Sequence, residues 1–170
     1  WLMNGATTTS SAYVGGGAGW SVPRTGDFNG DGKRDILWRQ PGTGYVYMAL
    51  MNGTTTTSLT FIGGSTDWSV AGTGDYNGDG KTDILWKQSP AGYVYMTLMN
   101  GATTTSSSFI GGSIDWSVVA TGDYNGDGKS DILWQQTSTG FVYMWLMNGA
   151  TTTSSTYTGG GTGWYVRSQP

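Results

Sequence analysis

A nine-residue acidic loop occurs three times in this chain of 170 residues, over 27–35, 75–83 and 123–131, with a spacing of 48 residues. Each copy places a side-chain oxygen at loop positions 1, 3, 5 and 9, and glycines at positions 4 and 6 permit a sharp turn. A short loop that presents several carboxylate and amide oxygens suits a hard cation such as Ca²⁺. We therefore predict about three Ca²⁺ ions per chain.

The predicted calcium ligands are the side chains at these four positions and the backbone carbonyl at position 7. Oxygen donors favour Ca²⁺ over softer metals, and the number of protein ligands disfavours Mg²⁺. Solvated Asp/Asn/Gly turns are the alternative, but three carboxylates packed into each of three loops favour a cation. We expect the ion to pin the loop rather than to be the biological function itself. The predicted ligands are Asp27, Asn29, Asp31, Lys33, Asp35, Asp75, Asn77, Asp79, Lys81, Asp83, Asp123, Asn125, Asp127, Lys129 and Asp131.

The composition excludes several function classes. The chain has no His, Cys or Glu, so a Ser-His-Asp or Cys-His nucleophile and a His- or Cys-ligated zinc or haem site cannot be built. Only Asp, Lys and Tyr remain for acid–base chemistry, and we predict that the chain is not an enzyme. The eight Lys and Arg residues are scattered, which predicts no nucleic-acid partner. No apolar run approaches the ~18 residues of a membrane span.

The 48-residue period organises the whole chain. It gives three full units, at 20–67, 68–115 and 116–163, while 1–19 matches the third and fourth strands of a unit and 164–170 begins another with a first strand. This period suits a four-stranded propeller blade. Each unit contains four short β-prone runs, and an Asn-Gly turn joins the last two. We predict an all-β fold: a β-propeller of four-stranded antiparallel blades, three complete, with a partial blade at the two ends.

The repeated string is specific. Thr-Gly-Asp-Phe/Tyr-Asn-Gly-Asp-Gly-Lys-x-Asp-Ile-Leu-Trp, followed by Tyr/Phe-Val-Tyr-Met-x-Leu-Met-Asn-Gly, resembles the FG-GAP or VCBS repeat of integrin α-chain-type β-propellers. In that family the loop lies between the first two strands of a blade and binds Ca²⁺, which the resemblance implies for all three loops here. Family propellers commonly have seven blades, more than this chain supplies. Weak Ca²⁺ sites fill in calcium-rich extracellular fluid, so we expect secretion or cell-surface display.

The nine Trp residues admit two interpretations. Large aromatic side chains can fill the space between blades, which we favour for any given Trp, or they can stack on sugar rings. Trp145 and Trp1 favour the second, because Ala49 and Thr97 hold the equivalent positions. We expect a carbohydrate-binding (lectin-like) or adhesive module, with a structural repeat scaffold or polymerising surface protein as the alternative. The candidate ligand-binding residues are Trp1, Trp20, Trp68, Trp116, Trp145 and Trp164.

The two ends of the chain are complementary. The first 19 residues match the third and fourth strands of a blade, and the last seven match a first strand. Unpaired strand edges favour association. We predict self-association through these ends into a ring or a filament. Closure within one chain into a small four-bladed ring, and membership of a longer propeller, are the alternatives.

Overall fold

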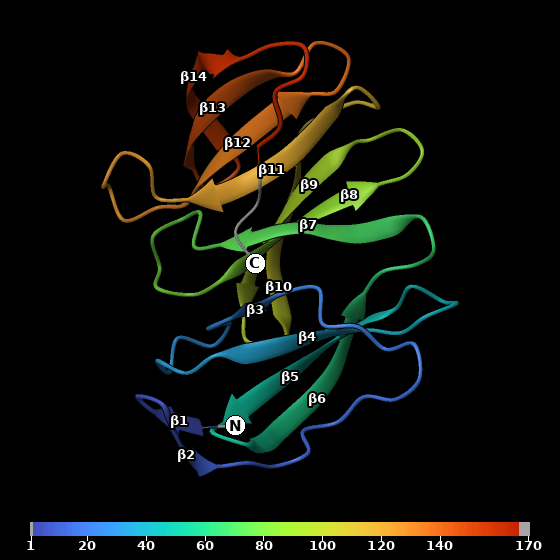
Figure 1. Ribbon diagram of the computed structural model, residues 1–170, viewed down its shortest axis with the longest axis vertical. Helices are drawn as coiled ribbons and strands as arrows, with labels where there is room; N and C mark the ends of the chain where they lie inside the picture. The colour runs from blue at the N-terminus through green and yellow to red at the C-terminus, as the bar shows by residue number, and fades with distance from the viewer. Residues whose placement is uncertain (1, 167–170) are drawn as a thin grey trace.

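The computed structural model describes residues 2–166, which form three four-stranded sheets and a two-stranded hairpin (Figure 1). The hairpin consists of β1 (Leu2–Asn4) and β2 (Thr7–Ser10). Blade 1 consists of β3 (Thr25–Gly26), β4 (Asp35–Arg39), β5 (Val46–Asn52) and β6 (Thr55–Gly63). Blade 2 consists of β7 (Trp68–Gly74), β8 (Asp83–Gln88), β9 (Val94–Asn100) and β10 (Thr103–Gly111). Blade 3 consists of β11 (Trp116–Gly122), β12 (Asp131–Gln136), β13 (Phe141–Asn148) and β14 (Thr151–Gly160).

Within each sheet, strands that follow one another in the chain pair antiparallel. This confirms the predicted all-β fold with the four-stranded blades of a β-propeller. Residues 2–166 contain no helix long and apolar enough to cross a membrane. The third and fourth strands are joined by the Asn-Gly turns, whose glycines have φ of 62° at Gly53, 60° at Gly101 and 57° at Gly149. Such positive angles are what a tight hairpin turn requires.

The first strand of blade 1 is shorter than its equivalents. Pro23 stands at the position of Ala71 and Val119, where β7 and β11 each contain a β-bulge. Proline lacks the backbone N–H that a sheet ladder needs and is tolerated at such bulges. Ser21 still forms a bridge with Arg39, so pairing continues on the far side of the proline.

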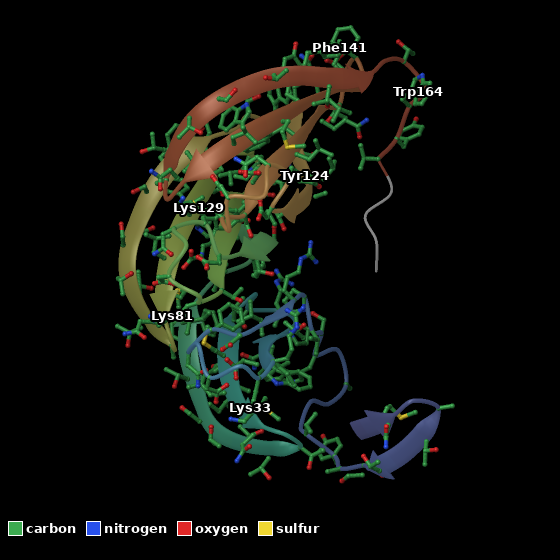
Figure 2. The ribbon with its side chains drawn as sticks, turned by 90° about the vertical axis from the view of Figure 1, so that its left-hand side faces the viewer. Lys33, Lys81, Tyr124, Lys129, Phe141 and Trp164 are labelled. Carbon is green, nitrogen blue, oxygen red and sulfur yellow. The ribbon has the colours of Figure 1, made fainter. Side chains whose placement is uncertain are left out.

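The blades follow one another along an open crescent (Figure 2). Their first strands line a central cavity of about 830 Å³, which Arg24 and Arg34 of blade 1 also line. Hairpin β1–β2 lies at one end of the crescent and blade 3 at the other (Figures 1 and 2). Residues 164–166 belong to no strand, so the first strand predicted for 164–170 is not formed there, and its remainder lies outside the described residues.

The hydrophobic core consists of two clusters, each formed between neighbouring blades. The first cluster joins blades 1 and 2, and its buried members are Phe28, Leu37, Val46, Met48, Val70, Ile84, Trp86 and Met99. The second joins blades 2 and 3, and its buried members are Tyr76, Leu85, Val94, Met96, Ile132, Trp134 and Met147. Because apolar burial is the dominant stabilising term in folding, each blade depends on its neighbour for its core.

Candidate metal loops and aromatic groove

The three acidic loops join the first and second strands of each blade, between β3 and β4, β7 and β8, and β11 and β12. Figure 2 labels Lys33, Lys81 and Lys129, one from each loop, and shows the loops following one another along the array. Neighbouring loops touch, since a Cβ atom added to Gly30 would lie 3.3 Å from Cγ of Lys81. The predicted metal ligands therefore form three separate but adjoining sets.

The aspartate at loop position 1 organises the turn around itself. Oδ1 of Asp27 accepts hydrogen bonds from the N–H of Gly30 at 2.7 Å and of Asp31 at 3.1 Å, and Oδ2 accepts one from Gly32 at 2.7 Å. Asp75 and Asp123 accept the equivalent bonds in their own loops. In each loop, three backbone N–H groups therefore converge on the carboxyl group of the first aspartate.

Hydrogen bonds also lower the pKa of two loop carboxyls. The pKa of Asp123 lies below its usual value chiefly because the N–H of Gly128 donates to it. The pKa of Asp31 is lowered chiefly by the Lys33 side chain, whose Nζ lies 3.1 Å from Oδ2. The equivalent distances are 3.6 Å for Lys81–Asp79 and 4.0 Å for Lys129–Asp127. These ion pairs are accessible to solvent and so contribute little to stability, and a divalent cation can compete with the lysine for the carboxylate.

The aspartate at loop position 9 is fully buried in all three loops, as Asp35, Asp83 and Asp131. Oδ2 of Asp83 accepts a hydrogen bond from the N–H of Tyr76 at 3.0 Å, and Oδ1 accepts one from Met99 at 2.9 Å. Burial raises the pKa of Asp83 to about 6, against the opposing effect of these two bonds. The carboxylate thus ties its loop to the third strand of the same blade.

The side chains at loop positions 1, 3, 5 and 9 offer a cation only oxygen atoms, which are the donors that Ca²⁺ prefers. A carboxylate offers about four lone-pair sites, of which the backbone bonds to Asp27 use three and those to Asp35 use two. In the part of the chain that the structure describes, no three acidic side chains lie close enough together to form a ready-made metal cluster. The carboxylates are instead directed to backbone N–H groups and, for Asp31, to the ammonium of Lys33.

The loops also hold the blades together, a role that the sequence did not predict. The carbonyl of Asp27 accepts a hydrogen bond from the N–H of Thr82 in the next blade at 2.7 Å, and that of Asp75 accepts one from Ser130 at 2.6 Å. The glycine before each loop permits this approach, because a Cβ atom on Gly26 would lie 2.5 Å from the Thr82 side chain. The repeated Thr-Gly-Asp string is the sequence signal from which this contact between blades could have been predicted.

Three tryptophans and a tyrosine line a groove of about 460 Å³ between blades 2 and 3. The rings of Trp134 and Trp145 lie 5.1 Å apart at 52°, and those of Trp116 and Tyr143 lie 5.5 Å apart at 73°. Nε1 of Trp134 is buried and has no hydrogen-bond partner within residues 2–166. The residues of this aromatic groove are Gly112, Ser113, Trp116, Trp134, Tyr143, Trp145 and Ser155.

The other candidate tryptophans lie elsewhere. Trp20 lines a separate cavity of about 240 Å³ on blade 1, and Trp68 packs against the first core cluster and against Tyr95 at 5.4 Å. Trp164 is 70% exposed, and Trp1 lies outside the described residues. The structure therefore brings together Trp116 and Trp145 and places beside them Trp134, which is buried in the second core cluster.

Two family models match this chain: an FG-GAP-like repeat over residues 27–86 and an FG-GAP repeat over residues 116–145. The chain belongs to the FG-GAP repeat family. The two matches in this FG-GAP protein contain all three acidic loops, so the predicted resemblance is confirmed. Searches of curated proteins and of solved structures give no significant match.

The family narrows the class of function. FG-GAP repeats form β-propeller modules of the recognition and adhesion type. They are typical of extracellular or surface proteins, and they are typically non-catalytic.

Proposed function

We propose that this FG-GAP protein is a calcium-stabilised extracellular recognition module that binds carbohydrate in the aromatic groove. The observation that carries the proposal is the groove itself, where Trp116, Trp134 and Trp145 meet between two blades. A pyranose ring presents a C–H face that stacks on an indole, while its hydroxyls need polar partners. Ser113 and Ser155 offer such partners in the same groove. The volume of about 460 Å³ suits a small ligand site.

Among the three complete blades, we expect only blade 3 to have a groove with this third tryptophan. The residues equivalent to Trp145 are Ala49 in blade 1 and Thr97 in blade 2. Ala49 is buried beside Trp38 in the smaller cavity, and its methyl group offers no ring for stacking. Trp145 therefore gives the groove of blade 3 an aromatic ring that the equivalent positions of blades 1 and 2 lack.

Calcium has an indirect role in this proposal. An ion held by loop 75–83 would stiffen the loop whose Asp75 carbonyl accepts the hydrogen bond from Ser130 of blade 3. That bond helps to set the junction at which the aromatic groove lies. Removal of calcium should therefore weaken glycan binding without any direct bond between ion and sugar. Secretion or surface display would keep weak Ca²⁺ sites filled.

A glycan array with Ca²⁺ and with a chelator tests this proposal. We expect binding in Ca²⁺ that Trp145→Ala weakens by tenfold or more, which corresponds to about 1.4 kcal/mol. Trp164→Ala is the matched control, because this exposed tryptophan lies outside the groove. Ala49→Trp should add a second, weaker site on blade 1. Unchanged binding by Trp145→Ala would contradict the assignment of the groove.

A structural repeat scaffold is the second candidate function. The observation that favours it is the face of blade 3 that no further blade formed by residues 2–166 covers, on which Tyr124 is 48% exposed. A scaffold would give no glycan signal in either condition and would still assemble. The array and a measurement of solution mass together distinguish the two functions.

A further inference from the structure

One side of the contact between neighbouring blades is formed by the aromatic residue at loop position 2 and by apolar residues of the second and third strands. We call this surface the socket. The aromatic residue at loop position 2 is fully buried where another blade follows, as Phe28 in blade 1 and Tyr76 in blade 2. Its equivalent in blade 3, Tyr124, is 48% exposed (Figure 2). Leu133 and Met144 are likewise half-buried, whereas Leu85 and Met96 at the same positions of blade 2 are buried. Blade 3 thus presents an uncovered copy of the socket.

The Asn-Gly hairpin of the next blade fills each covered socket. The N–H of Gly101 donates to the carbonyl of Phe28 at 2.8 Å, and the N–H of Gly149 donates to that of Tyr76 at 2.7 Å. The methionine two residues before each of these glycines, Met99 or Met147, is 1% exposed and belongs to the core cluster at that junction. We call this hairpin, which has the sequence Leu-Met-Asn-Gly-Ala in blades 2 and 3, the plug.

Hairpin β1–β2 is a further copy of this plug. Residues 2–9 read Leu-Met-Asn-Gly-Ala-Thr-Thr-Thr, identical to 98–105 and 146–153. Met3, which corresponds to the buried Met99 and Met147, is nevertheless 54% exposed, and the side chains of residues 3–10 are all exposed. The chain thus displays one plug whose interface side chain faces solvent.

A second observation marks the socket of blade 3 as open. Gly26 and Gly74 lie so close to the following blade that an added Cβ atom would come within 2.5 Å of Thr82 and of Ser130, respectively. The equivalent Gly122 would meet only Tyr124 of its own loop, at 3.9 Å. Among residues 2–166, no residue of another blade lies within 4 Å of a Cβ atom added at this position of blade 3.

We propose that hairpin β1–β2 of one copy of this chain docks on the Tyr124 face of a second copy. The occupant is a second copy because the hairpin and blade 3 lie at opposite ends of the crescent (Figures 1 and 2). By equivalence with the two internal junctions, the N–H of Gly5 donates to the carbonyl of Tyr124, and Met3 packs against Tyr124 and Leu133. The contact continues an interface that already occurs twice within the chain.

This contact is heterologous, since it joins different surfaces of the two copies. Heterologous contacts generate a closed ring when the rotation between copies closes, and an open filament when it does not. Among residues 2–166, each copy keeps one open socket, at Tyr124, and two Asn-Gly hairpins that fill no socket, β1–β2 and the Asn52-Gly53 hairpin of blade 1. Assembly therefore adds copies at either end.

Sedimentation of the 170-residue chain over a range of concentrations tests the proposal. We expect species heavier than the 18.0 kDa monomer, and we expect Met3→Asp and Tyr124→Asp each to reduce the mass to that of the monomer. Thr7→Asp is the control, because its equivalents Thr55, Thr103 and Thr151 are exposed in the assembled blades. A wild-type chain that remains monomeric at every concentration would overturn the proposal.

Mixing the two variants separates docking from misfolding. Met3→Asp retains an intact socket and Tyr124→Asp retains an intact plug, so an equal mixture should form dimers and nothing larger. A misfolded variant could not complement the other in this way. Absence of dimers in the mixture, with both variants folded by circular dichroism, would contradict the heterologous contact.

Cysteine cross-linking distinguishes a second copy from closure within one chain. A Cβ atom on Gly101 would lie 3.9 Å from Cβ of Asn29, a separation that suits a disulfide. Gly101→Cys with Asn29→Cys should therefore cross-link within each chain and serve as the control. Gly5→Cys with Asn125→Cys, the equivalent pair, should give ladders of linked chains on a non-reducing gel. Since the wild-type chain has no Cys, an exclusively intramolecular bond in the second pair would show closure in one chain and sink the proposal.

Discussion

Two aspartates within one loop have different roles, although the sequence presents them as members of the same ligand set. Asp79 lies at the surface beside Lys81, with 3.6 Å between Oδ2 and Nζ. Asp83 is fully buried and accepts two backbone hydrogen bonds that join its loop to β9. Buried N–H groups that lose their acceptor carry a full desolvation penalty, whereas a surface ion pair contributes little.

We predict that Asp83→Ala lowers the free energy of unfolding by about 2 to 6 kcal/mol, because the N–H groups of Tyr76 and Met99 would each lose a buried acceptor at about 1 to 3 kcal/mol. Asp79→Ala should change it by less than about 1 kcal/mol when calcium is absent. Urea unfolding of both variants in chelator measures the difference. Equal effects of the two substitutions would contradict the structural role of Asp83.

At the scale of elements, the turns between second and third strands bring the chain against its own backbone. Gly44, Gly92 and Gly140 have φ of 72° to 75°, and a Cβ atom added to Gly44 would lie 2.0 Å from the carbonyl oxygen of Ser65. Gly42, in the same turn as Gly44, has φ of 80° with open space around it. The two glycines share a conformational requirement and differ in steric surroundings.

We predict that Gly44→Ala destabilises the protein by about 3 to 5 kcal/mol, since left-handed strain of about 1 to 2 kcal/mol adds to a clash with backbone that cannot move aside easily. Gly42→Ala carries the strain alone and should cost about 1 to 2 kcal/mol. Chemical denaturation gives both values on the same chain. A Gly42→Ala variant as unstable as Gly44→Ala would show that conformation, rather than the approach to Ser65, decides the effect.

At the scale of the whole molecule, the three loops contain most of the negative charge and also form hydrogen bonds between neighbouring blades. Nine of the eleven acidic residues lie in the three loops, and the formal net charge is −3. The same loops donate and accept the hydrogen bonds between blades. Ions bound there would act on the whole array, because every junction between blades includes a loop.

We predict that saturating Ca²⁺ changes the formal net charge from −3 to about +3 and reverses the direction of native electrophoresis. Each filled site should stabilise the fold by about 2.7 kcal/mol at a free Ca²⁺ concentration of 100 times Kd. Calorimetry of Asp31→Ala, Asp79→Ala and Asp127→Ala measures the number of sites, and each variant should lose about one. Unchanged stoichiometry in all three variants would refute the loop sites.

The sequence by itself determined the blades and their turns. The 48-residue period, the Asn-Gly turns and the four short β-prone runs of each unit predicted three antiparallel four-stranded sheets, and the strands of the three blades lie where those signals place them. Such signals are local, because a turn or a strand face is set by residues a few positions apart. Pro23 is the instructive case, since it shortened β3 without removing the pairing of Ser21 with Arg39.

Only the tertiary structure decided which copies of a repeated residue differ in burial and in the side chains around them. Trp116, Trp134 and Trp145 meet in one groove, and Phe28 is buried while Tyr124 is exposed at the same position of its loop. Repeats that are nearly identical in sequence cannot carry this information, because burial depends on whether another blade packs against each face. The acidic loops are local in sequence, yet their role at the blade junctions follows from packing between residues about 50 positions apart, such as Asp27 and Thr82.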